Sequence, residues 1–210
     1  MVEALRKLAS RRVEGLEDLP DAEIVAMAKK ELPGDLTAYR EILRRYEGLV
    51  YNTCYKVLGS KGDAEEVAQD ALIQIFHKIH QFEGRAAFKT WLYKIVHNYC
   101  RNRISKIIRK REGQEAYEQH AADTMPDSDN PAENFERSAH VEEALGKLKE
   151  RDREIVVLKF MSGLTLQEIA DVLDLGLSAA KMRLYRALDE FKEAYVRLEK
   201  DAPVPVRTEE

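Results

Sequence analysis

Apolar side chains recur every three or four residues along most of this chain, which is the period of an amphipathic α-helix. No segment alternates apolar and polar positions with the two-residue period of a β-strand. The clearest helical pattern runs from about residue 35 to residue 58, where one face carries Leu36, Tyr39, Leu43, Tyr46, Val50, Thr53 and Val57. The sequence therefore predicts an all-α protein.

Three further helices are predicted in the first half of the chain. A short one spans residues 21–31. The next has Asp63 as its N-cap and Glu66 as the reciprocal capping-box partner, and its apolar face carries Ala64, Val67, Ala68, Ala71, Leu72, Ile75, Phe76 and Ile79. After a loop at 82–85, a helix that begins near Ala87 directs inward Phe88, Trp91, Leu92, Ile95, Val96, Tyr99, Ile104 and Ile107. These helices and the one at 35–58 can form one bundle.

A second helical group is predicted near the C-terminus. Residues 113–134 separate it from the first group, lack a helical period and contain prolines among Asp, Ser and Asn residues, which is typical of a flexible linker. One helix then begins near Glu136 and uses Val141, Leu145 and Leu148. The next follows Asp152 and uses Ile155, Val156, Leu158 and Phe160. The tail, 201–210, contains two prolines and is predicted to be disordered.

The segment between these helices and the tail has the pattern of a helix-turn-helix. Thr165 is a suitable N-cap for the first helix, and Glu168 completes its capping box. Ala170 is small, as the close approach of two crossing helices requires. Residues 174–176 supply the turn, in which the glycine is available for a positive φ angle, and Ser178 is the expected cap of the second helix.

The outer face of that second helix is suited to contact duplex DNA. In a helix-turn-helix the first turns of the second helix enter the major groove. Lys181, Arg183 and Arg186 can reach phosphates or guanine edges, while Met182 and Tyr185 offer apolar contacts. The alternative is an ordinary helical hairpin with a solvated basic face. The agreement of caps, turn and small residue favours the DNA reader.

Charge is distributed unevenly along the chain. The net charge of −4 and the pI of about 5.9 argue against a simple DNA binder, which usually has a basic domain. Residues 85–111, however, hold no acid and nine bases: Arg85, Lys89, Lys94, Arg101, Arg103, Lys106, Arg109, Lys110 and Arg111. Residues 112–136 hold no Lys or Arg and eight acids: Glu112, Glu115, Glu118, Asp123, Asp127, Asp129, Glu133 and Glu136. Two adjacent segments of opposite charge indicate that these charges serve a function and are more than an ordinary solvated surface.

The helix that begins near Ala87 combines aromatic and basic side chains. Trp91 and Tyr93 stand beside Lys89 and Lys94. Aromatic rings stack on unpaired bases, and nearby cations hold the nucleic-acid backbone. For Trp91 alone, a place in the core is the alternative. The basic block is harder to explain by packing, and it favours a contact with nucleic acid.

The histidines and cysteines are the other residues that could bind a metal or react, and their pattern supports neither role. His77, His80 and His97 lack convincing metal-ligand spacing and are predicted to be surface or loop residues. Cys54 and Cys100 fall on apolar helical faces without metal spacing, which predicts buried, reduced thiols. We therefore expect no metal and no cofactor.

Several classes of protein are disfavoured by what the sequence lacks. There is no Gly-rich phosphate loop, metal cluster or nucleophile elbow, so nothing supports an enzyme with an appended DNA-binding domain. No apolar run approaches the length that crosses a bilayer. The N-terminus has mixed charge and no apolar segment of the kind found in secretory signals. We expect a cytoplasmic protein with no membrane insertion.

Three segments resemble, in the same order, bacterial RNA polymerase sigma factors of the extracytoplasmic-function (ECF) group. They are residues 62–70 (GDAEEVAQD), 88–95 (FKTWLYKI) and 163–170 (GLTLQEIA). The similarity covers about residues 20–196, and the linker leaves no room for a region 3 domain. The resemblance implies an N-terminal extension at 1–20, a region 2 helical bundle at 21–111, an acidic linker at 112–136, a region 4 helix-turn-helix domain at 137–200 and a tail at 201–210.

The resemblance also implies two functions for region 2. The third helix would dock on a coiled coil of the largest catalytic subunit of core RNA polymerase, through Asp63, Glu65, Glu66, Gln69, Asp70 and Gln74. The alternative for this face is a solvated run of charges. The following loop and helix would bind the −10 element and hold the melted non-template strand, through Phe82, Arg85, Phe88, Lys89, Trp91, Asn98 and Arg101. Captured bases would offset the stacking energy that is lost when the duplex opens.

Region 4 would then contact the −35 element of duplex promoter DNA. The positions that match the family's contact sites are Lys159, Ser178, Lys181, Met182, Arg183, Tyr185 and Arg186. Many members begin the recognition helix with a Gly-Thr-Val-Lys-Ser-Arg-like segment, whereas residues 178–183 here are Ser-Ala-Ala-Lys-Met-Arg. Met182 thus removes a hydroxyl from the groove, so the resemblance does not identify which −35 bases this helix prefers.

The resemblance implies further partners and leaves one rival function. The acidic linker would thread the polymerase channel, with a solvated tether as the alternative, and its acids could shield the basic stretch in the free protein. An anti-sigma factor is a further implied partner. The rival is an autonomous helix-turn-helix regulator, which predicts tight duplex binding by the pure protein. The net acidity favours the sigma factor, which would bind promoters strongly only with core polymerase.

Overall fold

The computed structural model describes residues 15–114 and 132–201, and these residues form α-helices, one short 3-10 helix and connecting loops. No β-strand occurs in these two ranges, and the prediction of an all-α fold is confirmed. The elements are α2 (Asp21–Glu31), α3 (Thr37–Leu58), α4 (Lys61–Lys78), η1 (Ile79–Gln81), α5 (Phe88–Gln114), α6 (Ala132–Lys147), α7 (Glu150–Phe160), α8 (Leu166–Val172) and α9 (Leu177–Asp201).

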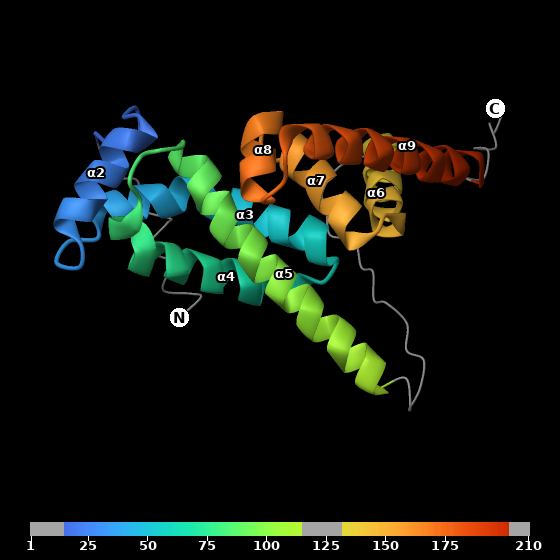
Figure 1. Ribbon diagram of the computed structural model, residues 1–210, viewed down its shortest axis with the longest axis horizontal. Helices are drawn as coiled ribbons and strands as arrows, with labels where there is room; N and C mark the ends of the chain where they lie inside the picture. Colours follow the sequence, from blue (N-terminus) through green and yellow to red (C-terminus); the bar gives the residue numbers. More distant parts are fainter. Residues whose placement is uncertain (1–14, 115–131, 202–210) are drawn as a thin grey trace, which may run out of the picture.

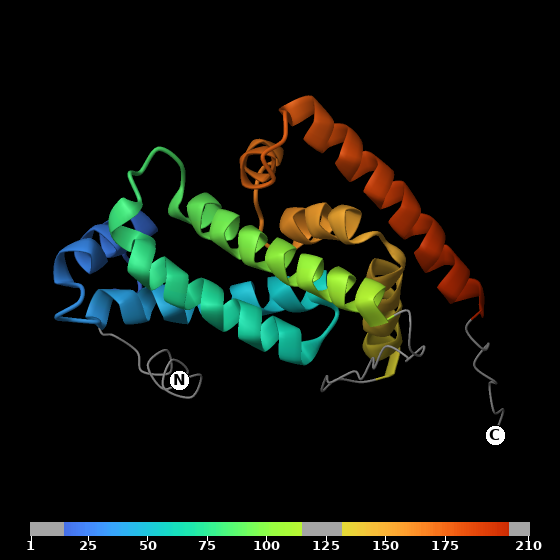
Figure 2. The same cartoon turned by 60° about the horizontal axis from the view of Figure 1, so that its bottom comes forward.

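The helices form two groups that lie side by side (Figures 1 and 2). In the N-terminal bundle, α3 packs against α2, α4 and α5. In the C-terminal group, α9 packs against α6, α7 and α8. The groups contact each other where α3 meets α7 and α5 meets α8, and their buried apolar side chains join in one continuous cluster.

The start of α4 differs from the prediction. The helix begins at Lys61, and its N-cap is Ser60, whose hydroxyl accepts a hydrogen bond from the Asp63 backbone nitrogen at 3.4 Å. The expected capping box of Asp63 and Glu66 is therefore wrong. Both carboxylates instead bind the guanidinium of Arg103 on α5. Ser60 provides the local cap, and Asp63 and Glu66 are engaged in a long-range ion pair that the sequence pattern could not reveal.

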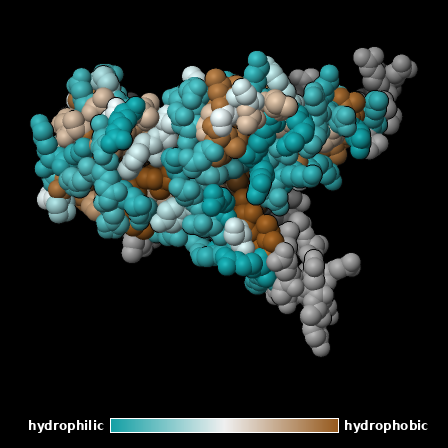
Figure 3. All heavy atoms as spheres, viewed as in Figure 1, coloured by the Kyte–Doolittle hydropathy of each residue, from teal (hydrophilic) through white to brown (hydrophobic). Residues whose placement is uncertain are grey.

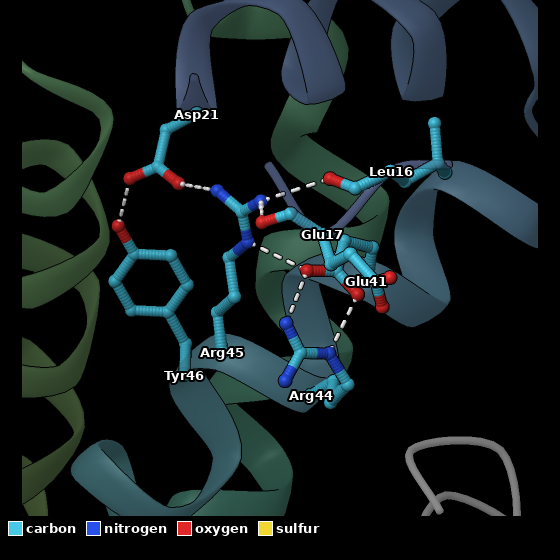
Figure 4. A network of polar contacts seen from close by, with 7 residues as sticks. All are labelled: Leu16, Glu17, Asp21, Glu41, Arg44, Arg45 and Tyr46. Carbon is cyan, nitrogen blue, oxygen red and sulfur yellow. Dashed lines mark hydrogen bonds and ion pairs between the residues drawn. The ribbon is translucent and has the colours of Figure 1, made fainter. Parts of the chain in front are cut away.

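A network of charges around the buried Glu41 ties Leu16, Glu17 and the start of α2 to α3 (Figure 4). Glu41 is fully buried and accepts hydrogen bonds from Arg44 at 2.6 and 2.7 Å and from Arg45 at 2.7 Å. Arg45 continues to Asp21 at 2.8 Å and to the Leu16 carbonyl oxygen at 3.0 Å. These bonds fix the entry of the chain into the N-terminal bundle.

The two cysteines are buried and free, as predicted. They are also neighbours, because α3 and α5 bring Cys54 Sγ and Cys100 Sγ to 3.7 Å from each other. The hydrogen bond to the adjacent Cys54 thiol and burial raise the pKa of Cys100.

Several predictions lie wholly or partly outside the described residues. They concern most of the N-terminal extension (1–14), most of the acidic linker (115–131) and most of the tail (202–210). Within the described part of the chain, none of the helices combines the length and the apolar character that crossing a membrane requires.

Candidate nucleic-acid interface

The helix-turn-helix forms as predicted, with two changes: the residue of positive φ angle in the turn and the start of the second helix. Thr165 and Glu168 make the complete capping box of α8, and Ala170 is fully buried at the crossing. The positive φ angle of the turn, +53°, belongs to Asp174 and not to Gly176. Aspartate tolerates this conformation better than most residues. The second helix, α9, already begins at Leu177, so the predicted cap Ser178 lies inside its first turn.

The outer face of α9 presents a compact set of exposed side chains. Met182 is 74% exposed and Tyr185 is 57% exposed, both large values for apolar or aromatic groups. Lys181 Nζ lies 5.8 Å from the centre of the Tyr185 ring, within range of a cation–π contact. Ser178 is exposed on the same helix, and Lys159, at the end of α7, is half-buried. This face can offer apolar, aromatic and cationic contacts to a groove.

Two arginines of α9 are held by an acid of α7. Asp152 is buried, with its Oδ1 3.0 Å from Arg186 NH2 and 3.5 Å from Arg183 Nε. Arg183 also donates to the Arg151 carbonyl oxygen, and burial lowers the pKa of its guanidinium. Arg183 is thus turned toward α7, whereas the Arg186 side chain remains 63% exposed. Of the predicted DNA-contacting cations, Lys181 and Arg186 stay accessible.

One residue of α7 was expected in the core and is not there. Phe160, the last residue of the helix, is 64% exposed. The helical period placed it with Val156 on an inward face, but α7 ends where its neighbours no longer cover it. A periodic pattern does not indicate where the covering surface stops.

Three aromatic rings gather at the start of α5. Their centres are 5.4 Å apart for Phe82 and Phe88, 5.5 Å for Phe82 and Trp91, and 5.7 Å for Phe88 and Trp91. Phe88 is buried, while Phe82 and Trp91 are half-buried. Lys29 of α2 donates to the Phe82 carbonyl oxygen at 2.8 Å and holds the loop before α5 in place. Phe88 therefore supports the cluster from the core, and the other two rings form its accessible part.

The remaining predicted −10 residues have mixed surroundings. Arg85 is exposed in the loop and pairs with Glu83. Asn98 and Arg101 are exposed on α5. Lys89 is half-buried, because its side chain reaches the loop before α8. Its Nζ lies 3.6 Å from the position that a Cβ atom on Gly163 would occupy.

His97 corrects the prediction that the histidines lie at the surface or in loops. It is only 8% exposed, and its Nδ1 lies 2.5 Å from Glu154 Oε1 of α7. His77 and His80 are exposed, as expected. The contact joins two elements 57 residues apart, so no local pattern could have indicated it.

The predicted polymerase-docking face of α4 divides into two parts. Asp63 and Glu66 bind Arg103, as described above. Glu65, Gln69 and Gln74 are half-buried, and Asp70 is exposed.

Comparisons with known proteins agree with this architecture. The family model of sigma-70 region 2 matches residues 42–111, and that of sigma-70 region 4 matches residues 139–190. The ECF RNA polymerase sigma factor SigW of Bacillus subtilis is 30% identical over 174 residues, which cover 79% of this chain and 92% of SigW. The chain belongs to the ECF sigma factors.

Other relatives of this sigma factor are more distant but match as much of the chain. The ECF RNA polymerase sigma-E factor of Escherichia coli is 28% identical over 180 residues, covering 81% of this chain and 92% of that protein. Among solved structures, CnrH in complex with the cytosolic domain of CnrY has a TM-score of 0.61 at 23% identity and covers 87% of this chain and 99% of its own. RpoE of Bartonella quintana, in complex with the anti-sigma factor NepR, has a TM-score of 0.64 at 20% identity, covering 78% of this chain and 98% of its own. These two structures share the fold.

Membership of this family fixes the general function. A sigma factor binds core RNA polymerase and directs it to promoter DNA for the start of transcription, and the family consists of DNA-binding regulators rather than enzymes. Among the described residues, no group of three or more His, Cys, Asp or Glu side chains could hold a metal ion.

Proposed function

We propose that the two helical groups divide the work of promoter recognition in this ECF sigma factor. Residues 21–111 would bind core polymerase and the −10 element, residues 137–200 would bind the −35 element, and residues 1–20, 112–136 and 201–210 would be an extension, a linker and a tail. The observation that carries this assignment is that one chain presents two exposed surfaces suited to contact DNA. One is the exposed face of α9 around Lys181, and the other is the accessible aromatic pair formed by Phe82, in the loop before α5, and Trp91, on the basic helix α5.

The −35 assignment is supported by what remains accessible on α9. Lys181, Met182, Tyr185 and Arg186 would enter the major groove, with Ser178 at the start of the helix and Lys159 at its edge. Arg183 would act mainly by holding α9 on α7 through Asp152, since it is turned away from solvent.

The −10 assignment is supported by the ring cluster. Phe82 and Trp91 would receive an unstacked base, and Phe88 would hold both rings from below. Arg85, Lys89, Asn98 and Arg101 would hold the backbone of the melted strand.

Core polymerase would bind the exposed part of α4, with Asp70 as the charge most available to a basic partner and Glu65, Gln69 and Gln74 around it. Asp63 and Glu66 would act through Arg103, which they fix against α5. We also propose a cytoplasmic site of action. We further propose an anti-sigma factor as a regulator, because RpoE of Bartonella quintana, which has this fold, was solved in complex with the anti-sigma factor NepR.

The assignment is tested by transcription reconstituted from the full chain, bacterial core polymerase and a library of promoters. The expected result is enrichment of templates with a defined −35 and −10 pair, which depends on the core enzyme. Tight and specific duplex binding by the pure protein, unchanged by core polymerase, would instead identify an autonomous regulator.

Replacing Lys181 by alanine is expected to weaken promoter binding by about 1–3 kcal/mol if Lys181 reads a base edge. If it binds a phosphate, the loss is uniform across sequences and the salt dependence falls by about one charge. Promoter binding by the holoenzyme, measured at several salt concentrations, separates these cases, and affinity for core polymerase should not change.

Lys192→Ala is the matched control for this variant. Lys192 is an exposed lysine on a later turn of α9, beyond the turns that enter the groove. Arg186→Ala is a less clean test, because it also removes a partner from the buried Asp152. Equal effects of the Lys181 and Lys192 variants would contradict a specific contact by Lys181.

Replacing Trp91 by alanine is expected to reduce promoter opening about tenfold, because stacking of a base on an aromatic ring contributes about 1–3 kcal/mol. Permanganate reactivity of unpaired thymines in the −10 region measures the opening directly. Trp91→Phe keeps an aromatic face and should retain most of the activity. Normal opening by the alanine variant would remove Trp91 from the proposed site.

A further inference from the structure

The two cysteines form a thiol pair in the core of the N-terminal bundle, apart from both proposed DNA-binding surfaces. Cys54 of α3 and Cys100 of α5 are 46 residues apart in the sequence, and they are the only cysteines of the chain. Their Sγ atoms lie 3.7 Å from each other, and the two residues are 0% and 1% exposed. The fold therefore brings every thiol of the chain into one contact.

Packing alone does not explain why both of these positions carry a thiol. Val50 and Val57 are the buried residues about one turn before and after Cys54 on α3, and Val96 is buried one turn before Cys100 on α5. Small aliphatic side chains thus fill the surrounding core. A free cysteine packs like such a side chain, and its reactivity is what distinguishes it. Two thiols in contact have a chemistry that two valines lack.

The two thiols differ in their hydrogen bonding. Cys100 Sγ donates to Cys54 Sγ, and this hydrogen bond, followed by burial, raises the pKa of Cys100. The charge of Glu154 on α7 acts in the same direction. Cys54 is the accepting sulfur, so the pair stabilises an anion at Cys54, and the thiolate is the form that attacks an oxidant. Cys54 is therefore placed for the first attack and Cys100 for the second.

Burial determines which oxidant the pair can meet. Glutathione or a thiol of another protein is too large to reach these sulfur atoms while the bundle is folded. Hydrogen peroxide is only slightly larger than water, and local fluctuations of the bundle admit it slowly. The chain offers no third thiol, so an internal disulfide is the expected product. In reducing compartments, disulfides of this kind are typically transient and sense the redox state.

We propose that Cys54 and Cys100 are an oxidative modification site, which a peroxide converts into a disulfide between α3 and α5 that reduces capture of the −10 strand. First, the Cys54 sulfur attacks a peroxide oxygen. An S–O bond forms, the O–O bond breaks, and one water leaves with the thiol proton. The Cys100 sulfur then attacks the sulfenic acid, so that the S–S bond forms, the S–O bond breaks and a second water leaves. The two sulfurs lose two electrons, which the peroxide oxygens gain.

The bond acts on −10 binding through the position of α5. The sulfur atoms of a disulfide are about 2 Å apart, so the present contact has to close by roughly 1.7 Å. A close-packed core transmits such a displacement to its surroundings. Asn98 and Arg101 lie within two residues of Cys100 on α5 and belong to the proposed −10 set. This consequence rests on the proposed function of α5, whereas the modification itself does not.

The modification is tested on the full chain with hydrogen peroxide as the only oxidant. Titration of the denatured protein should show the loss of both thiols. Peptide mapping without reductant should find the segments around Cys54 and Cys100 joined, with the loss of two hydrogen atoms, and a non-reducing gel should show a monomer. The single variants Cys54→Ala and Cys100→Ala cannot close the bond and should give no joined peptides.

The consequence is tested by promoter opening with core polymerase, after the oxidant has been removed. Permanganate reactivity in the −10 region should fall on the order of tenfold, which is the effect of losing one stacked base. It should return once dithiothreitol has restored both thiols. Cys54→Ala combined with Cys100→Ala is the matched control, because it keeps Met182, which is 74% exposed and open to oxidation. Methionine sulfoxide requires a dedicated reductase, so recovery with dithiothreitol identifies the thiol pair.

The possible results separate this inference from the proposed function. Thiols that survive a dose of peroxide that fully oxidises Met182 would overturn the modification site, as would oxygen added to either cysteine without a joined peptide. A disulfide that leaves promoter opening unchanged, or an equal loss of opening in the double alanine variant, would overturn its effect on the −10 strand. A reduced chain that never opens promoters with core polymerase would refute the proposed function, because the joined peptides are detected without polymerase or DNA.

Discussion

Replacing Glu41 by alanine should lower the free energy of unfolding of the N-terminal bundle by about 3 kcal/mol, because it leaves Arg45 half-buried without its main acidic partner. Glu41 is itself fully buried and accepts from both Arg44 and Arg45 (Figure 4). Trp91 is the sole tryptophan of the chain and lies in this bundle. Urea unfolding followed by tryptophan fluorescence therefore measures the relevant unit directly.

The same carboxylate predicts a pH dependence. The hydrogen bond from Arg44 is the main cause that holds the pKa of Glu41 below its ordinary value of 4.5, against the opposing effect of burial. A lowered pKa means that the stabilisation is fully present above about pH 4.5 and is lost as the pH falls through the folded-state pKa. Wild type and the alanine variant should therefore converge in stability at acidic pH.

Glu23→Ala is the control, since Glu23 is an exposed acid on the adjacent helix α2. Its loss should change the unfolding free energy by less than about 0.5 kcal/mol. A similarly small effect of Glu41→Ala would mean that the network of Figure 4 does not hold Leu16, Glu17 and Asp21 on α3.

The fold could be predicted from local patterns wherever one helix face is buried along its whole length. The bounds of α2 were predicted to the residue, and the Thr165–Glu168 capping box was predicted with its partner, because caps and periods act over four residues. The failures occurred at helix ends with competing options. At α4 both Ser60 and Asp63 could cap, and the distant Arg103 decided between them.

The residue types of the candidate site could be predicted from the sequence, but the burial and contacts of each side chain could not. The sequence indicated that α5 is basic and aromatic and that Phe88 points inward, yet not that Phe82 and Trp91 would pack on Phe88 as the accessible part of one cluster. It also could not indicate that His97 would be enclosed by Glu154, since that contact depends on how two helical groups pack. The face seen in Figure 3 is mostly hydrophilic, which agrees with the predicted solvated and charged surfaces.

The accessible charge on α4 gives the largest functional prediction. Reversing it in Asp70→Lys should weaken binding to core polymerase about 100-fold, because a like charge placed against a basic partner costs several kcal/mol. Asp70 is exposed and has no ion pair among residues 15–110 and 139–200, so the change should leave the fold intact. Glu66→Lys is less informative, because it also breaks the pair with Arg103.

Asp18→Lys is the matched control for the reversal at Asp70. Asp18 is an exposed aspartate that precedes α2, so the substitution changes the net charge of the same bundle by the same amount. Binding of labelled core polymerase and promoter-directed transcription should both fail for Asp70→Lys and persist for Asp18→Lys. If the two reversals weaken core binding equally, the polymerase senses net charge and not this face of α4, and the docking surface must be sought elsewhere on the bundle.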